Sequence, residues 1–208
     1  MSSLRVICYD GADFTGKTTS CINTRNAILA KAGNSAIIMM HFPIRNLNTD
    51  IEMVNTDIKP EIFQLCDKLS GKSMIEIQDT IAANIEANSR ILLETLSIGN
   101  EWSLSSKEND SSRVTVIIDR FIYSNIVYRR MYCGQTIVFD EFMKNYKYAS
   151  RIMESAEINI LTESIEELIT RKMRRYSTEQ PDEGTIDMIN EENENINRAN
   201  EEFKKFIS

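Results

Sequence analysis

The stretch GADFTGKTTS, residues 11–20, decides the fold, and it follows the apolar run LRVICYD at 4–10. Its first eight residues fit the pattern GxxxxGK[ST], and they lie where a phosphate-binding loop requires them, between a predicted buried strand and a predicted helix. Such a loop turns successive backbone N–H groups inward, and its lysine and its Ser/Thr hydroxyl serve the outer phosphates and magnesium. The residues expected to contact a nucleotide are Gly11, Asp13, Phe14, Thr15, Gly16, Lys17, Thr18 and Thr19.

Four short apolar runs alternate along the chain with segments of helical periodicity. The predicted strands are 4–10, 35–42, 113–120 and 157–163; the predicted helices are 17–31, a region after Pro60, 77–96, 122–131, 137–153, 164–175 and an acidic helix after Pro181. This alternation predicts a parallel sheet covered on both faces, and right-handed crossovers make it doubly wound. We expect an α/β fold of the P-loop NTPase type with four to five strands, in one domain over 1–208. The polar stretch at 100–112 is expected to be a surface loop.

The composition is that of an ordinary globular domain, with 42% hydrophobic and 26% charged residues in a chain of 208. A formal net charge of −7 argues against binding to nucleic acid, which favours a basic surface. The sequence has no run of eighteen apolar residues and no signal-peptide core, so we expect no membrane partner and a cytoplasmic location. Cys8, Cys21, Cys66 and Cys133 form no CxxC pair and are expected to be buried, reduced thiols.

Two arginines follow neighbouring strands of the predicted sheet. Arg45 closes the segment HFPIR, and Arg120 belongs to the segment DRFIYS. The carboxyl ends of strands form the ligand crevice of a doubly wound sheet, so both arginines are expected near the phosphate loop, where a planar guanidinium fork suits a phosphate. A surface ion pair is the alternative for each arginine. The predicted metal ligands are Thr18 and Asp119, the latter as the carboxylate behind the magnesium ion.

A cluster of cations closes the predicted helix at 164–175. Four of the five residues in RKMRR, 171–175, are basic in an otherwise acidic chain, and the polar segment YSTEQPDEGT follows them. This placement predicts a mobile lid, about 171–185, whose cations close over transferring phosphates. The alternative is that the cations complement the negative end of the helix dipole.

Taken together, YDGADFTGKTT, FPIR and DRFIYSNIVY resemble the thymidylate kinase family in their order and intervals, over roughly residues 4–190. The resemblance implies phosphoryl transfer from ATP with Mg²⁺ to a deoxynucleoside monophosphate, usually dTMP, by a cytoplasmic homodimer. The acceptor phosphate is already an adequate nucleophile, so catalysis would consist of positioning and charge neutralisation.

The resemblance also implies roles for single residues of this chain. Lys17 and Thr18 would bind the donor phosphates and magnesium. Asp13 would contact the sugar hydroxyl of the acceptor, and Arg45 would contact its phosphate. The residues expected to hold the acceptor are Asp13, Phe42, Arg45, Asn84, Asn88, Arg120, Ser124 and Tyr128.

The charge that neutralises the moving phosphoryl group comes, on this resemblance, from the lid. Phe14 occupies a place at which some family members carry a cation in the loop, so Arg174 or Arg175 would supply that charge here. The expected catalytic groups are Lys17, Arg45, Arg120, Arg174 and Arg175.

The long predicted helix departs from the family pattern at the residues that recognise the base. The family usually has an aromatic residue and an arginine there, and this chain has Ile81 and Ile85 in their places. Polar contacts give the sharpest base discrimination, so both changes concern the identity of the base. Asn84 and Asn88, one turn apart, are candidates to read a base edge, with helix packing or solvent exposure as alternatives. The chain also ends in an acidic helix where the family adds a fifth strand.

Two other functions are compatible with the motifs. A deoxynucleoside kinase shares the fold and a DR-type motif, but it phosphorylates a 5′-hydroxyl and needs a carboxylate base. The arginine of FPIR favours an acceptor that already carries a phosphate. A non-catalytic nucleotide-binding relative is the third reading, and the intact set Lys17, Thr18 and Asp119 argues against it.

Overall fold

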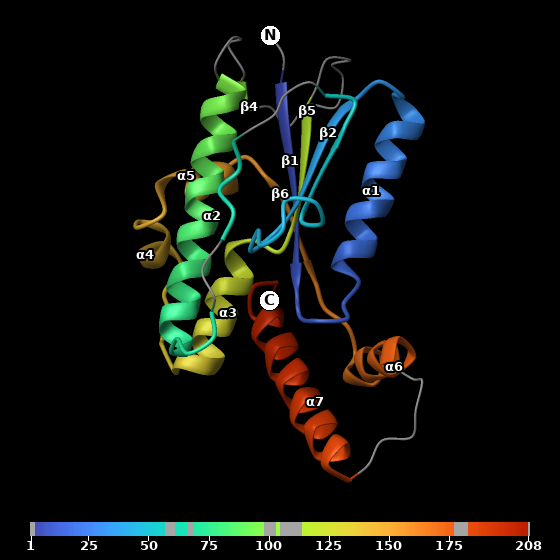
Figure 1. Ribbon diagram of the computed structural model, residues 1–208, viewed down its shortest axis with the longest axis vertical. Coiled ribbons are helices and arrows are strands. Elements are labelled where there is room, and N and C mark those ends of the chain that lie inside the picture. Colours follow the sequence, from blue (N-terminus) through green and yellow to red (C-terminus); the bar gives the residue numbers. More distant parts are fainter. Residues whose placement is uncertain are drawn as a thin grey trace.

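The structure is a computed structural model that describes residues 3–56, 61–65, 69–97, 103–104, 114–176 and 183–207 (Figure 1). Its centre is one sheet, composed of β1 (Ser3–Gly11), β2 (Ala36–His41), β3 (Ile51–Val54), β4 (Ser103–Leu104), β5 (Val114–Asp119) and β6 (Glu157–Leu161). The order is β3-β2-β5-β1, and β4 and β6 pair one after the other along the remaining edge of β1. The pairs of β1, β2, β5 and β6 are parallel, which confirms the predicted fold class.

Two strands go beyond the four that the apolar runs predict. β3 is a four-residue edge strand that pairs antiparallel with β2, and its Glu52 and Met53 are exposed, as is usual for a short edge strand. β4 has two residues and pairs with the start of β1. It lies inside the stretch 100–112 predicted as a loop, whose other residues are outside the described part of the chain. The described residues thus form six strands, one more than the upper end of the expected range of four to five.

Helices cover both faces of the sheet (Figure 1). One face carries α1 (Lys17–Lys31), which packs against β1 and β5. The other face carries α2 (Met74–Ser97), α3 (Ile122–Cys133) and α5 (Lys147–Met153). The remaining helices are α4 (Phe139–Met143), α6 (Ile165–Tyr176) and α7 (Glu183–Lys204).

Side chains of β5 point alternately into the two helical layers, as the two-residue period of a strand requires. Val116 and Ile118 pack in the cluster that includes α2 and α3 residues. Ile117 packs with Cys21 of α1 on the opposite face. Every residue of β5 is buried, so the strand fixes the position of the residues that follow it at its carboxyl end.

The helix predicted over 137–153 is two helices, α4 and α5, separated at 144–146. The physical reason lies on α2. The Glu86 carboxylate accepts hydrogen bonds from the backbone N–H groups of Tyr148 and Ala149, both at 2.9 Å. A carboxylate that binds the free N–H groups of a first turn favours a helix start at that point. A contact from another helix thus divides a segment whose own periodicity is continuous.

The helical region predicted after Pro60 is also wrong for the described residues 61–65, which are not helical. The Leu65 N–H donates to the Ile44 carbonyl at 2.7 Å, so this segment lies against the loop after β2 instead of forming its own helical hydrogen bonds. Cys66, predicted to be a buried thiol, lies outside the described residues. Cys8 and Cys21 are buried free thiols, whereas Cys133 is only partly buried.

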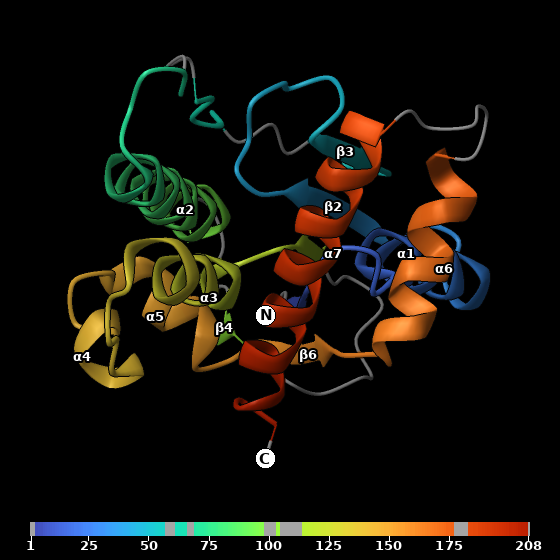
Figure 2. The same ribbon diagram turned by 90° about the horizontal axis from the view of Figure 1, so that it is seen from below.

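Helix α7 passes beside the ends of the central strands, between α3 and α6 (Figure 2). Phe203 is fully buried and packs with Val127 of α3 and with Ala12, the residue after β1. The C-terminal helix is therefore part of the core next to the phosphate loop. Among the helices of the described residues, none is long and apolar enough to cross a membrane.

Candidate functional site

The phosphate loop joins β1 to α1 through three residues with positive φ. These are Gly11 at 150°, Phe14 at 65° and Gly16 at 90°. The Ala12 carbonyl accepts a 2.8 Å hydrogen bond from the Thr15 hydroxyl and a 2.5 Å hydrogen bond from Lys17 Nζ. Internal bonds of this kind hold the loop in shape, and a preformed loop with inward N–H groups suits a phosphate. Thr18 and Thr19, at the start of α1, are exposed.

Lys17 is the buried cation of the loop, with 5% of its surface exposed. Burial and, to a smaller extent, the nearby Arg120 guanidinium together lower the pKa of its ammonium group to about 8, against the opposing effect of Asp13, Asp119 and Asp10. A buried ammonium with a lowered pKa lacks the full counter-charge that it needs. An anion in the loop would provide that charge.

Asp119 lies at the end of β5 opposite Thr18. Its Oδ2 accepts a 2.5 Å hydrogen bond from the Thr18 hydroxyl and lies 3.1 Å from Nδ1 of His41. Burial alone would raise the pKa of Asp119, but the contacts with His41, Thr18 and Lys17 lower it below its ordinary value, so the carboxylate is ionised at neutral pH. Its Oδ1 is buried and has no hydrogen-bond partner among the described residues.

These two side chains fit the predicted magnesium site. A hydroxyl and an ionised carboxylate are oxygen ligands of the type that Mg²⁺ takes, and the ion usually keeps several waters and binds phosphate oxygens as well. The unpartnered Oδ1 of Asp119 is consistent with a further ligand at this point. A cluster of three or more acidic, histidine or cysteine side chains that could hold a metal by itself does not occur among the described residues.

Asp10 is a functional residue that the sequence motifs did not single out. It is fully buried at the end of β1, and its Oδ2 accepts hydrogen bonds from the backbone N–H groups of Phe121 and Ser124, at 3.0 and 3.3 Å. Its Oδ1 accepts the Ser124 hydroxyl. Asp10 thus caps the N-terminus of α3 from another element and fixes the DRFIYS segment relative to the loop. Burial raises its pKa above the ordinary value, against the effect of these hydrogen bonds and Lys17.

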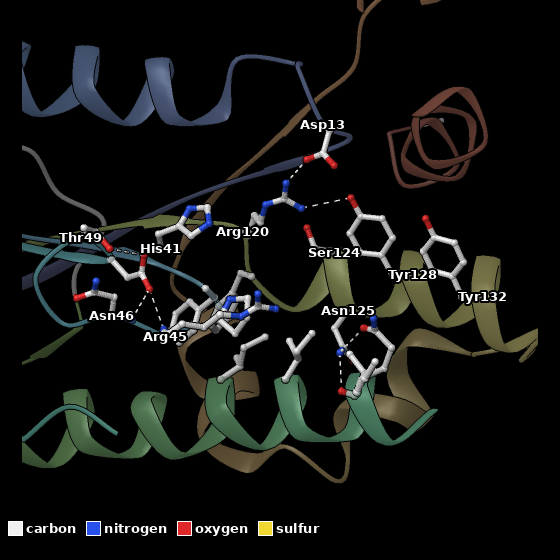
Figure 3. Close-up of a pocket in the computed structure, with 18 residues that line it drawn as sticks. Asp13, His41, Arg45, Asn46, Thr49, Arg120, Ser124, Asn125, Tyr128 and Tyr132 are labelled. Carbon is white, nitrogen blue, oxygen red and sulfur yellow. Dashed lines mark hydrogen bonds and ion pairs between the residues drawn. The ribbon is translucent and has the colours of Figure 1, made fainter. Parts of the chain in front are cut away.

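Asp13 and Arg120 connect the loop to the end of β5. Arg120 Nη2 donates to Asp13 Oδ1, and Arg120 Nη1 donates to the Tyr128 hydroxyl at 3.2 Å (Figure 3). Arg120 has a φ of 65°, which is uncommon for a residue with a side chain, and its N–H donates to the Tyr9 carbonyl at 2.9 Å. Strained backbone of this kind concentrates at binding sites. The guanidinium of Arg120 points toward Asp13 of the phosphate loop (Figure 3).

A cavity of about 630 Å³ opens beside this pair, which is within the size range of small-ligand sites. Figure 3 shows the side chains that line it, which come from the phosphate loop, the end of β2 and the loop after it, the residues that follow β5, α2 and α3. The residues predicted to hold an acceptor that line the cavity are Asp13, Phe42, Arg45, Arg120, Ser124 and Tyr128. The structure therefore brings together six of the eight side chains predicted for this purpose.

The backbone around Arg45 is fixed while its side chain stays available. Asp50 Oδ2 accepts hydrogen bonds from the N–H groups of Arg45 and Asn46, both at 2.7 Å, and Gln64 donates to the Arg45 carbonyl at 2.6 Å. The Arg45 guanidinium is exposed, lines the cavity, and makes no ion pair or hydrogen bond with another described residue. The surface ion pair considered as an alternative is absent for Arg45 in this part of the chain.

The interpretation of Asn84 and Asn88 as readers of a base edge is wrong. Both are fully buried and neither lines the cavity. Asn84 Oδ1 accepts the Ile44 N–H at 3.0 Å, and Asn88 Oδ1 accepts the Phe63 N–H at 2.7 Å. Both amide groups also donate to the Phe63 carbonyl. The two asparagines satisfy the backbone of the irregular segments after β2, which is the packing alternative that the sequence left open.

Two of the four cations in the basic run at 171–175, Arg171 and Lys172, make contacts with other parts of the described chain. Lys172 is buried and pairs with Glu192 of α7 at 2.7 Å, so it connects α6 to α7. Arg171 donates to the Phe14 carbonyl at 3.4 Å. Arg174 is exposed on α6, whereas the Arg175 side chain and residues 177–182 of the lid lie outside the described part.

Arg171 is thus a cation of α6 that contacts the phosphate loop, at the residue, Phe14, where some members of the family carry a cation. It is also paired with Glu163 at 3.0 Å and with Glu167 at 2.8 Å. Glu167 stands four residues before Arg171 on the same helix, a spacing that predicts the ion pair between them but not the contact with Phe14. The assignment of this charge to Arg174 or Arg175 stays a prediction.

No protein-family model and no curated protein sequence matches this chain. Among solved structures, it is similar to the crystal structure of thymidylate kinase from Ehrlichia chaffeensis, with 82% of each chain covered. The sequence identity is 18% and the TM-score is 0.47. At this level of similarity, a function has to be derived from the residues of the site.

Proposed function

We propose that this protein is a nucleoside monophosphate kinase that transfers the γ-phosphate of ATP to dTMP and releases ADP and dTDP. The observation that carries the proposal is the ion pair between Asp13 of the phosphate loop and Arg120 of the cavity. It connects a loop suited to the donor phosphates with a cavity suited to a nucleotide. Phosphoryl transfer needs the two phosphates side by side and surrounded by cations.

Each cation would act on a different oxygen. Lys17 would bind the donor phosphates, and the exposed guanidinium of Arg45 would hold the phosphate of the acceptor. Arg120, oriented by Asp13 and Tyr128, would face the group in transfer. Mg²⁺, held through Thr18 and Asp119, would neutralise charge on the donor phosphates. An oxygen of the acceptor phosphate forms the new bond as the bond between the β- and γ-phosphates breaks, so no proton has to be removed.

A nucleoside kinase fits the cavity less well. That reaction needs a carboxylate base at the 5′-hydroxyl, and the acidic residues that line the cavity are Asp13 and Asp50. Asp13 is paired with Arg120, and Asp50 holds the backbone N–H groups of Arg45 and Asn46. The guanidinium of Arg45, which has no partner among the described residues, favours instead an acceptor that brings its own negative charge.

The direct test is turnover. Purified protein is mixed with ATP and Mg²⁺ and, one at a time, with nucleoside monophosphates and nucleosides, and products are separated by chromatography. We expect dTDP from dTMP. Phosphorylation of nucleosides alone would replace this proposal by the nucleoside kinase reading, and no product from any acceptor would favour a non-catalytic relative.

Arg45→Ala is expected to raise KM for the monophosphate by about 10–100-fold and to change KM for ATP by less than about threefold. The reason is that removing one charge-assisted, bidentate partner costs about 1.5–3 kcal/mol of binding. Steady-state kinetics with each substrate varied separately measure both values. Arg90→Ala is the matched control, because Arg90 is exposed on α2 and pairs with Glu94 away from the cavity. Equal increases in both KM values would contradict the role assigned to Arg45.

Binding of ADP is expected to take up a proton near pH 8.5 and to weaken as pH rises above 8. In the free protein Lys17 has a pKa of about 8, so the group is largely neutral at pH 8.5 and must gain a proton to face a phosphate. At pH 6.5 it is already charged and contributes no uptake. Calorimetry in two buffers of different ionisation enthalpy measures the uptake, and Lys17→Met should abolish it at pH 8.5. An unchanged uptake in that variant would show that another group is responsible.

A further inference from the structure

A network of buried amides lies where α2 meets α3, on the wall of the cavity. Gln78 of α2 is 5% exposed and Asn125 of α3 is 1% exposed, and both line the cavity. Asn125 Nδ2 donates to the Gln78 backbone carbonyl at 2.8 Å and to Gln78 Oε1 at 3.0 Å. Arg129 Nε donates to Asn125 Oδ1 at 2.9 Å. The neighbouring cavity residues of α2, which are Ile77, Ile81 and Ile85, are apolar.

The partners of Asn125 allow only one orientation of its amide. Arg129 can only donate, so it requires the oxygen of Asn125 on its side, and a backbone carbonyl can only accept, so it requires the nitrogen on the other. Arg129 is itself held, because its Nη2 donates to Asp79 at 2.6 Å and its guanidinium lies 5.3 Å from the centre of the Phe142 ring. With Asn125 fixed, the Gln78 atom that accepts from it must be the oxygen.

This orientation leaves the Gln78 Nε2 group as a donor with no hydrogen-bond partner among the described residues. Asn125 Oδ1 accepts from Arg129 and keeps a second lone pair. Gln78 lines the cavity, so this donor can be reached by a ligand atom there. The cavity wall thus offers a donor on Gln78 and an acceptor on Asn125, and Arg129 prevents this polarity from reversing.

We propose that Gln78, held in one orientation by Asn125 and Arg129, selects a nucleotide base that presents a carbonyl next to a ring N–H. The Gln78 amide donates to the base carbonyl, and the ring N–H donates to Asn125. Uracil, thymine, hypoxanthine and guanine have this edge. Cytosine and adenine have an amino group next to an unprotonated ring nitrogen, so their polarity is opposite at both positions. This inference rests on the proposed function, because it assumes that a nucleoside monophosphate occupies the cavity.

The test compares pairs of monophosphates that differ only at this edge, dUMP with dCMP and dIMP with dAMP. Calorimetry measures their dissociation constants, with ADP as an independent probe of the phosphate loop. The intact protein is expected to bind at least one carbonyl-bearing member at least about tenfold more tightly than its amino-bearing counterpart, since unpaired buried polar groups discriminate strongly. In Gln78→Leu this ratio should fall to within about threefold of unity, while ADP binding stays unchanged.

Two further variants separate the selection from general damage to the fold. Gln135→Leu makes the same substitution at a partly buried residue outside the cavity lining and should keep the full ratio. Arg129→Met frees Asn125 to turn, so the ratio should fall chiefly because the amino-bearing member binds more tightly. A merely structural role for Arg129 would instead weaken both members equally.

Three results would overturn the inference. In the first, monophosphates bind but the members of each pair bind alike. In the second, the ratio is present but Gln78→Leu leaves it unchanged. Both results would leave the kinase proposal standing. In the third, ADP binds but no monophosphate does, which would overturn the kinase proposal as well.

Discussion

Lys17→Met is expected to lower kcat/KM for phosphoryl transfer by about 10²–10³-fold or more, the usual effect of removing one preorganised charge partner of a transition state. The folded protein should not lose stability. Because burial lowers the pKa of Lys17 to about 8, more protons bind to the unfolded than to the folded state between pH 8 and 10.5. The charged group therefore disfavours folding at neutral pH, and its stability contribution improves only as pH rises through this range.

The measurement combines steady-state kinetics with a thermal unfolding curve at pH 7. Lys31→Met is the matched control, because Lys31 is exposed in the last turn of the same helix. We expect the control to retain activity and Lys17→Met to unfold no earlier than the unchanged protein. If Lys17→Met stayed active, the role of the phosphate loop in the reaction would be contradicted.

Gly11→Ala is expected to destabilise the fold by about 3 kcal/mol. Overpacking costs about 1–3 kcal/mol, and holding a residue with a Cβ at a positive φ costs about 1–2 kcal/mol. A Cβ at this position would lie 2.3 Å from the Leu161 carbonyl oxygen of β6, and φ is 150°. The carbonyl belongs to the strand paired with β1 and cannot move away alone. Chemical denaturation measures the loss.

Gly71→Ala separates the two causes. Gly71 also has a positive φ, 85°, but a Cβ there would meet no atom of the described residues within 4 Å. Gly71→Ala should therefore lower the free energy of unfolding only by the cost of the positive φ, about 1–2 kcal/mol. If both variants lose the same free energy of unfolding, the close approach of β6 is not the reason why position 11 requires glycine.

Most of the sheet could be predicted from the sequence because its central strands β1, β2 and β5 are largely buried and read as continuous apolar runs. β5 is the clearest case, since all six of its residues are buried. The break between α4 and α5 could not be predicted in this way. It depends on Glu86, which lies more than sixty positions away from the N–H groups that it caps. Periodicity reports on the face of a helix and carries no information about such distant caps.

Some residues of the candidate site could likewise be predicted from the sequence and others could not. The phosphate loop, Asp119 and Arg120 lie in motifs with fixed spacing, so the sequence alone could identify them. Asn84 and Gln78 are both polar residues on α2, and nothing in their spacing distinguishes the one that satisfies buried backbone from the one that lines the cavity. That difference is set by the loop after β2 and by α3, which the chain brings to α2 only on folding.

The central claim is that one site holds two nucleotides with their phosphates in contact. A single ligand tests it, namely adenosine and thymidine joined through their 5′ positions by five phosphates. Linking two groups that bind at once raises affinity by about 10²–10⁴-fold. Calorimetry should therefore give a dissociation constant at least about a hundredfold below those of ADP and dTMP alone, and Arg45→Ala should remove most of this gain. A linked ligand that binds no more tightly than ADP, with or without Arg45, would contradict the claim.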